Sequence, residues 1–432
     1  MTRMKESGID WIGQIPEEWE VTRIKNIVSI ERGASPRPID KFISDDDTGV
    51  NWIRIGDTYK GNKYITSTKL KITNRGKQFS RYIHPGTLIL SNSMSFGEPY
   101  ISSIYGCIHD GWLSLAPYKN ISKEYLYWLL LSDVCTSQFN LVSIGAVVEN
   151  LSVDKVGNTL VSMPYSLSEQ QKIADFLDKK TAQLDKAKAL LEEQIQKLKD
   201  YRASLIYETV TKGLDKTVPM KDSGIDWIGQ IPQGWGVIKF KHLGDVKQGL
   251  TYSPSDIVDK DEGILVLRSG NIQNGILDFN NNVYVKTKVA ESILLRKNDI
   301  LITARNGSSA LIGKNAIIDT DIKATFGAFM MVFRANKSLF AKFAFYLMNV
   351  SFNFYRTFFT TSTVNQLTAA IFNGIEVPLP SIYEQKKITD FLDGKTVQID
   401  KLIQIKNQQI ENINKQRQTL IYDYVTGKRR VY

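Results

Sequence analysis

EQQKIADFLDKKTAQLDKAKALLEEQIQKLKDYRASLIYETV, residues 169–210, is the longest helical pattern in the chain without a glycine or proline. Leucine recurs at every seventh position along it, with Ile173, Ala187 and Ile195 at or near the positions between. Such a strict seven-residue repeat is typical of a coiled-coil seam rather than of a globular helix face. We predict a long helix over residues 166–213 whose seam is formed by Leu177, Leu184, Leu191, Leu198 and Leu205.

Both ends of this stretch have helix boundary signals. Ser166 and Glu169 have the spacing of a capping box, in which the two side chains satisfy free backbone N–H groups of the first turn. Lys212 followed by Gly213 is a suitable C-terminal stop.

The same pattern occurs a second time near the end of the chain. EQKKITDFLDGKTVQIDK, residues 384–401, matches EQQKIADFLDKKTAQLDK about 215 residues earlier. Lys406 stands where Leu191 stood and Gly394 where Lys179 stood, so we expect the second helix to be the weaker one. Its predicted seam is Leu392, Ile399, Ile413 and Leu420.

Two helices of this length are expected to pair with each other. At about 1.5 Å per residue each would extend on the order of 60 Å, and a lone one would expose its apolar stripe to water. Pairing covers both stripes. An antiparallel pair would relate the two halves of the chain by a pseudo-twofold axis.

A second repeat precedes each globular region. MKESGIDWIGQIP, residues 4–16, returns as MKDSGIDWIGQIP, residues 220–232. A match of this length between two segments does not arise by chance. We expect Trp11, Ile12 and Ile15 to form a strip that packs on a neighbouring element, rather than a ligand site.

Between each leader and its helix lie roughly 150 residues in which similarity falls to short islands. The islands, such as WIRIGD at 52–57 and VLRSGN at 266–271, are rich in aliphatic residues and bounded by turn formers, so we predict strands. We predict a helix near the end of each region. The fold class is therefore α+β, with two similar globules whose loops differ, separated by two long helices in an antiparallel coiled coil. The expected boundaries are 1–165, 166–213, 214–380 and 381–432.

Bulk composition sets broad limits on function. The chain has 432 residues, 42% of them hydrophobic, which suffices for more than one buried core. Its formal charge of +10 favours a polyanionic partner. The first residues, MTRMKESGID, carry charges where a signal peptide is apolar, and two cysteines suit a reducing compartment, so we expect a cytoplasmic protein.

A search for catalytic and metal-binding motifs is negative. Three histidines and two cysteines cannot make the usual zinc sets, although Cys107 and His109 are close in sequence. The segment 307–315, GSSALIGKN, has the wrong spacing for a phosphate loop, and no dinucleotide-binding or nucleophile-elbow motif occurs. We therefore expect no catalytic residue, no metal and no cofactor in this chain, and interpret it as a binding component.

The divergent loops carry residues typical of nucleic-acid recognition. Arginine and asparagine can bind the edges of guanine and adenine, whereas lysine mostly neutralises phosphate. Any one of these side chains could be an ordinary solvated charge. Arg54 and Arg268 lie in the same repeated island, which favours a structural or phosphate-binding role for both. The candidates for DNA binding are Arg32, Arg37, Lys60, Lys63, Arg75, Lys77, Arg81, Lys247, Tyr252, Arg268, Lys286, Lys288, Arg305, Asn306 and Lys314.

Together these features resemble the specificity subunit of a type I restriction-modification system. The resemblance covers essentially the whole chain and includes PYSLSEQQKIADFLD, PLPSIYEQKKITDFLD, the SGIDWIGQIP leaders, and the helix ends LIYETVTKG and LIYDYVTGK. It implies two target-recognition domains that bind a split double-stranded DNA target, with the helices as a ruler. It also implies two modification subunits docked on the helices, and restriction subunits in the complex. S-adenosylmethionine, ATP and magnesium would bind to those partners.

Two other classes of function stay open from the sequence. One is a self-contained DNA methyltransferase or nuclease with unrecognised motifs, and the other is a coiled-coil scaffold without a DNA role. If the helices act as a ruler, the spacing of the half-sites can be predicted. Two recognition domains on the same face of B-DNA need half-sites about 34 to 36 Å apart. Removing one heptad from one helix would shift a head by about 10 Å.

Overall fold

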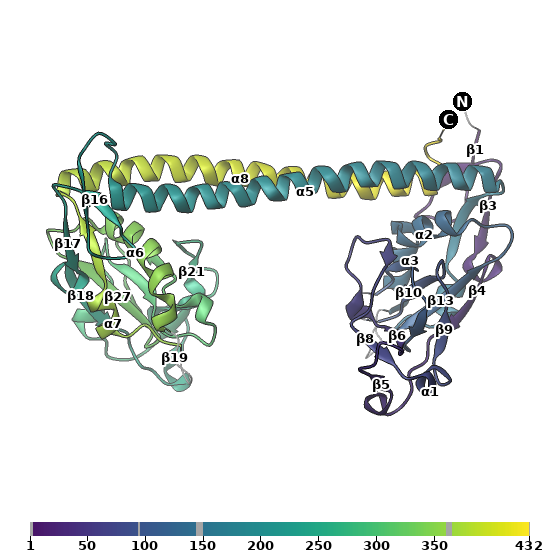
Figure 1. The fold of residues 1–432 in the computed structure, drawn as a ribbon, viewed down its shortest axis with the longest axis horizontal. Helices are drawn as coiled ribbons and strands as arrows, with labels where there is room; N and C mark the ends of the chain where they lie inside the picture. Colours follow the sequence, from purple (N-terminus) through teal and green to yellow (C-terminus); the bar gives the residue numbers. More distant parts are fainter. Residues whose placement is uncertain (1–2, 94–95, 144–149, 360–364, 432) are drawn as a thin grey trace. The chain divides into compact units, whose positions relative to one another are not determined.

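The structure, a computed structural model, describes residues 3–93, 96–143, 150–359 and 365–431. The chain divides into two compact units, residues 1–192 with 407–432 (unit 1) and residues 193–406 (unit 2). Two long helices, α5 (Leu167–Lys212) and α8 (Ile382–Val425), each contribute to both units (Figure 1). Each globule is therefore compact together with a segment of both helices.

Unit 1 contains two five-stranded sheets. In the first, all four residues of β10 are buried, because a helix covers one face of the sheet and the second sheet lies toward the other. Its order is β4 (Val28–Arg32), β13 (Trp112–Pro117), β10 (Leu88–Ser91), β11 (Pro99–Ser102) and β7 (Tyr64–Ile65). The second sheet has the order β5 (Ile43–Ser44), β8 (Leu70–Ile72), β6 (Val50–Ile53), β12 (Gly106–Ile108) and β9 (Arg81–Ile83).

Unit 2 repeats this topology with four strands per sheet. The parallel pair β6–β12 in unit 1 has its counterpart in β20–β26, and β10 has its counterpart in the fully buried β24. One sheet is β18 (Gly244–Gln248), β27 (Met330–Ala335), β24 (Ile300–Thr303) and β25 (Asn315–Ile317). The other is β19 (Ile257–Val258), β23 (Val283–Val285), β20 (Ile264–Leu267) and β26 (Ala324–Phe326).

Short ribbons and helices complete both units. The two-stranded ribbons are β1 (Met4–Glu6) with β2 (Gln14–Pro16), β3 (Trp19–Arg23) with β14 (Leu160–Pro164), β15 (Met220–Asp222) with β16 (Gln230–Pro232), β17 (Gly236–Lys239) with β28 (Glu376–Leu379), and β21 (Ile272–Gln273) with β22 (Ile276–Leu277). The shorter helices are α1 (Asn74–Lys77), α2 (Lys123–Leu131), α3 (Asp133–Ser143), α4 (Val153–Gly157), α6 (Ala341–Tyr355) and α7 (Ala369–Gly374). The predicted α+β class is confirmed.

In unit 1 the start of α5 pairs with the end of α8. The rings of Phe176 and Tyr424 lie 4.4 Å apart between centroids. Further along α5, the Asp185 carboxylate lies 3.6 Å from the guanidinium of Arg417. A later residue of one helix thus meets an earlier residue of the other, as an antiparallel pair requires.

Unit 2 shows the same antiparallel pairing in its own segments. Arg202 lies 3.6 Å from Asp400, and the Lys406 ammonium donates to Gln194 Oε1 at 2.6 Å. Lys406, which we expected to weaken the seam, thus has a partner across it. The helix also continues unbroken through Gly394, whose Cα faces open space.

The seam positions alternate with polar positions that the sequence pattern did not reveal. Leu177, Leu392 and Ile399 are buried, while Leu184, Leu191, Leu198, Leu205, Ile413 and Leu420 are half-buried. Buried threonines, Thr181 in α5 and Thr396 in α8, occupy two of the positions between them, where their hydroxyls donate to carbonyls four residues earlier. The helix pair is therefore less apolar than a standard zipper.

The repeated Glu-Gln pair explains how each long helix is joined to its globule. Gln170 is buried, and its amide donates to Pro164 O at 2.9 Å and Asn120 O at 3.1 Å, while its Oε1 accepts from Ser122 N at 2.7 Å. Gln385 makes the corresponding three bonds in unit 2, with Pro380 O, Ser338 O and Phe340 N. The preceding glutamates, Glu169 and Glu384, accept from the indoles of Trp19 and Trp235.

Each leader packs at the C-terminal end of a long helix. In unit 2, Gly213 ends α5 with φ +73°, and a side chain there would meet Trp235 at 3.1 Å. In unit 1, Gly427 follows α8 with the same φ and abuts Pro16. The predicted docking role holds for Ile12 and Ile15, which are buried, whereas Trp11 is 46% exposed.

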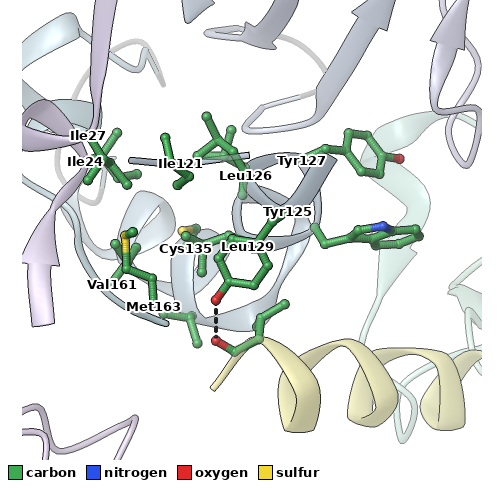
Figure 2. Packing of buried hydrophobic residues seen from close by; sticks show 14 of the residues in the cluster. Ile24, Ile27, Ile121, Tyr125, Leu126, Tyr127, Leu129, Cys135, Val161 and Met163 are labelled. Atoms are coloured by element: carbon green, nitrogen blue, oxygen red, sulfur yellow. Dashed lines mark hydrogen bonds between the residues drawn. The ribbon is translucent and has the colours of Figure 1, made fainter. Parts of the chain in front are cut away.

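The core of unit 1 includes the end of α8 as well as the globule (Figure 2). Tyr125 of α2 is fully buried, and its hydroxyl points at α8 and donates to Val425 O at 3.2 Å. Burial raises the pKa of this phenol, so it stays a donor. Cys135 in the same core is a free thiol, as is Cys107.

Metal clusters and membrane-spanning helices are both absent from the residues that the structure describes. Among them, no three His, Cys, Asp or Glu side chains lie close enough together to bind a metal ion. Within the same residues, no helix is both long and apolar enough to cross a membrane.

Candidate nucleic-acid interface

Two equivalent turns organise the candidate residues, one in each unit. Turn 1 (residues 109–111) precedes β13, and turn 2 (residues 327–329) precedes β27. The backbone of one glycine passes very close to each turn. A Cβ on Gly33 would lie 2.1 Å from His109 O, and one on Gly249 would lie 2.1 Å from Gly327 O. Only glycine permits this approach. The loops that leave β4 and β18 are thereby held directly over the turns.

In unit 1 three of the predicted arginines gather at turn 1. Arg32 Nε donates to Asp110 O at 3.0 Å, and Arg37 Nη2 lies 3.3 Å from Asp110 Oδ2. Arg81 Nε donates in turn to Arg32 O at 2.8 Å. The Ser35 hydroxyl, which bonds Asp110 Oδ1, holds the pKa of that carboxyl below its usual value. The Arg37 side chain is nevertheless 82% exposed, so its charge is available to a ligand.

The other candidates of unit 1 have surroundings that differ from those of turn 1. Lys77 Nζ lies 3.5 Å from the centre of the Tyr82 ring. Lys63 is paired with Asp178 of α5 at 2.6 Å and is only 12% exposed, so it ties the globule to the helix. Lys60 pairs with Glu98 at 3.3 Å, and Arg75 is exposed on α1.

A hollow of about 790 Å³ lies beneath segment 35–40 beside turn 1, with Trp52 and Leu70 in its lining. Arg54 also lines it, and its Nε is buried without a hydrogen-bond partner, 3.8 Å from the nearest carboxylate oxygen, that of Asp57. Donors and apolar surface thus meet in one cleft, as in many ligand sites.

His109 joins turn 1 to the repeated island at 52–57. Its ring nitrogens lie 2.7 Å from Gly111 N and 3.1 Å from Ile55 N. Both backbone groups are N–H donors, so a neutral ring accepts from one of them through its unprotonated nitrogen, whereas a doubly protonated ring can accept from neither. Burial also lowers the pKa of His109. The neutral ring therefore belongs to the folded form of this turn.

Turn 2 has Ala328 where turn 1 has Asp110, and it carries a projecting aromatic side chain, Phe329, at the position of Gly111. The backbone N–H groups of Ala304 and Arg305 both donate to Phe329 O, at 2.9 and 3.0 Å. Phe329 is 61% exposed. The Arg305 guanidinium carbon lies 5.7 Å from the centre of its ring, and Arg305 Nη2 donates to Gln366 Oε1 at 2.7 Å.

Of the further candidates in unit 2, Arg268 borders the same turn, and Lys314 and Asn306 lie on neighbouring loops. The aliphatic part of Arg268 lies beside Gly327, where a Cβ would meet its Cγ at 3.9 Å. Lys314 Nζ donates to Ser269 O at 3.2 Å, and partial burial lowers the pKa of its ammonium. Asn306 belongs to the loop after β24, and its Oδ1 accepts from Ser308 N.

The remaining candidates of unit 2 differ in their neighbours. Tyr252 follows the glycine loop that pairs with turn 2 through Leu250. Lys247 lies 3.8 Å from Asp245, and Lys286 lies 3.7 Å from Glu262. Lys288 is exposed in the loop after β23.

The repeated island gives Arg54 and Arg268 the same local role. The backbone N–H of Arg54 donates to Asp57 Oδ2, and that of Arg268 donates to Asn271 Oδ1, each at 2.9 Å. Sequence reasoning did not single out Phe329 or Gln366. No short motif distinguishes Phe329 from the buried phenylalanines around it.

The comparisons with known proteins agree on one family. The sequence profile of the type I restriction modification DNA specificity domain matches residues 16–199 and again residues 232–415. The specificity subunit of type I restriction enzyme EcoKI from Escherichia coli K12 is 31% identical over 206 residues, which is 46% of this chain and 44% of that protein. The MjaVIII specificity subunit from Methanocaldococcus jannaschii is 23% identical over 97% of this chain and 94% of that protein.

Solved structures show the same fold. A chain from a structure of the type I R-M system, described for its complex assembly and conformational transition, has a TM-score of 0.76 at 16% identity, over 96% of this chain and 99% of that one. The HsdS subunit from Thermoanaerobacter tengcongensis has a TM-score of 0.53 at 16% identity, over 96% and 98%. With the family profile matched twice over most of its length, this protein belongs to the type I restriction modification DNA specificity family.

Proposed function

We propose that this chain is the DNA-recognition subunit of a type I restriction-modification complex. Each unit binds one part of a split target, and the paired helices set the unread gap between the parts. The observation that carries the proposal is the equivalence of the two turns. The turn of one unit is surrounded by Arg32, Arg37 and Asp110, whereas the equivalent turn of the other has Arg305 and Phe329.

The scaffold also supports the ruler. α5 and α8 are paired antiparallel in both units, and buried Gln170 and Gln385 join each globule to its helix. Two units of like construction with different loops suit a target made of two different sequences. The candidate lysines and arginines would supply the charge that binds phosphate, and neutralising about 6 to 10 phosphates should lower affinity by about 10³ to 10⁵ between 50 and 200 mM salt.

We further propose that the chain has no catalytic activity of its own. Two modification subunits would dock on the helices, bind S-adenosylmethionine and methylate adenine, and restriction subunits would cut with ATP and magnesium. In this scheme the chain supplies the target choice and its partners supply the chemistry.

Methylation mapping tests the proposal. Adenine methylation should be mapped across host DNA with and without this gene, and a single bipartite motif should disappear when the gene is removed. An unchanged methylation pattern would contradict the proposal. Labelled S-adenosylmethionine incubated with DNA and the purified chain should give no incorporation, and incorporation without partners would favour a self-contained methyltransferase.

A further inference from the structure

Turn 2 holds its exposed aromatic ring in a fixed position. The Phe329 carbonyl accepts two backbone hydrogen bonds from the loop after β24, and the turn itself is closed by a bond from Met330 N to Gly327 O at 2.8 Å. The ring therefore projects from a rigid backbone. An exposed phenylalanine in such a setting is available to contact a ligand with little loss of conformational entropy.

The guanidinium beside this ring is equally constrained. Arg305 is joined to Gln366 twice, by a backbone bridge and by the side-chain bond to Gln366 Oε1. Asn365 Nδ2 also donates to Gly307 O at 3.1 Å, which ties the two loops together. One N–H of Arg305 is thus used to orient the group, and a guanidinium has four more to offer.

The charge around turn 2 indicates what the ring contacts. Arg268 and Arg305 are cationic and border the turn, and cationic Lys314 bonds the carbonyl next to Arg268, which favours a polyanionic ligand over an apolar protein surface. In the major groove, arginine binds guanine O6 and N7 with two hydrogen bonds, and phenylalanine contacts the C5 methyl of thymine. Ring and guanidinium are neighbours here, so their two base partners must be neighbours as well.

We propose that Arg305 binds a guanine and Phe329 covers the methyl group of an adjacent thymine in the half-site recognised by unit 2, with Gln366 as the residue that positions Arg305. This rests on the proposed function of the chain and adds to it the bases and the atoms involved. It also makes the two units chemically different, since turn 1 has Gly111 at the position of Phe329 and an acidic Asp110 at the position of Ala328.

Replacing single bases of the DNA by analogues that lack one group tests the proposal with the wild-type protein. After the target has been mapped, the full chain assembled with its modification subunits is titrated with duplexes that replace each thymine by uracil or each guanine by 7-deazaguanine. One uracil should weaken binding by about fourfold, the value of one buried methyl group. One adjacent 7-deazaguanine should weaken binding by up to about 150-fold.

Matched variants then assign those bases to residues. Phe329→Ala should abolish the uracil effect, whereas Phe358→Ala, at an equal 61% exposure in the same unit, should keep it. Arg305→Lys keeps the charge but loses the paired donors, so it should remove the guanine preference and leave the other half-site unchanged. Gln366→Ala should reduce the guanine preference without abolishing it.

Several outcomes would overturn this assignment. They are a mapped target without a guanine next to a thymine, a uracil effect that persists in Phe329→Ala, or a Phe329→Ala protein that loses its modification subunits but keeps its base preferences. Each of these leaves a sequence-specific complex in place. Failure of the proposed function would instead show as no preferred sequence at all.

Discussion

The two turns show how one scaffold serves two recognition surfaces. Turn 1 places Asp110 under Arg37 beside a hollow, and turn 2 places Phe329 beside Arg305 on a projecting loop. What is common to both lies in the backbone, where Gly33 and Gly249 make the same 2.1 Å approach. The comparison teaches that the strand framework is fixed while the side chains at the loop tips are free to differ.

The largest expected effect comes from the junction that both units share. Gln170→Ala should destabilise unit 1, and Gln385→Ala unit 2, by on the order of 3 kcal/mol, because each removes three hydrogen bonds made by one buried side chain. Denaturant unfolding of the full chain measures this. Gln171→Ala is the matched control, since that side chain is exposed and should cost little. Unequal losses in the two units would break the equivalence.

Replacing the glycines that pass close to the turns should destabilise the units somewhat less. Gly33→Val or Gly249→Val forces the loop away from its turn and should destabilise its own unit by about 1 to 3 kcal/mol. Methylation mapping should show lost recognition in one half-site for each variant. Gly56→Ala, at a position open to solvent, serves as the control. Loss of both half-sites from either change would show that the turns do not act separately.

Low pH should affect the stability of the two units differently, because unit 1 has His109 where unit 2 has Gly327. The pKa of His109 is lowered by burial in the folded chain, so the unfolded chain binds the proton more readily. Stability is complete above the ordinary pKa of about 6.5 and falls below it, at no more than about 1.4 kcal/mol per pH unit. Unfolding of wild type and His109→Gln between pH 7.5 and 5.5 tests this. An equal acid sensitivity in the variant would exclude His109 as the cause.

The smallest effect is expected for a single exposed cation. Arg37→Ala should lower the slope of log affinity against log salt by about 0.9, the contribution of one phosphate contact. Binding titrations at several salt concentrations measure the slope. Lys119→Ala, at an exposed position between β13 and α2, should leave it unchanged. A slope that stays the same in Arg37→Ala would remove turn 1 from the DNA contacts.

The architecture could be predicted from the sequence because the chain contains long repeats. Leucines seven residues apart predicted the helix pair, and the duplicated leader predicted buried Ile12 and Ile15. The prediction for Trp11 was wrong, because this side chain is 46% exposed, whereas Trp227 at the same position of the second leader is buried. Thr181 and Arg202 were missed in the seam because a pattern of leucines carries no information about polar partners across the pair.

The candidate interface was less predictable than the fold. Arg37 and Lys63 have the same type of charge in the same type of loop, yet one is solvent-exposed and the other is paired with Asp178. Phe329 could not be separated from buried aromatics, because exposure is a property of the turn rather than of the residue. Three-dimensional neighbours decide these cases, and sequence spacing does not supply them.

The central claim is that the paired helices set the gap between two half-sites. Deleting residues 186–192 of α5 together with the facing residues 409–415 of α8 keeps the antiparallel pairing and shortens it by about 10 Å, or about three base pairs. Adenine methylation mapped in cells carrying this variant tests the claim directly. The account predicts unchanged half-sites separated by a gap about three base pairs shorter, and an unchanged gap would contradict it.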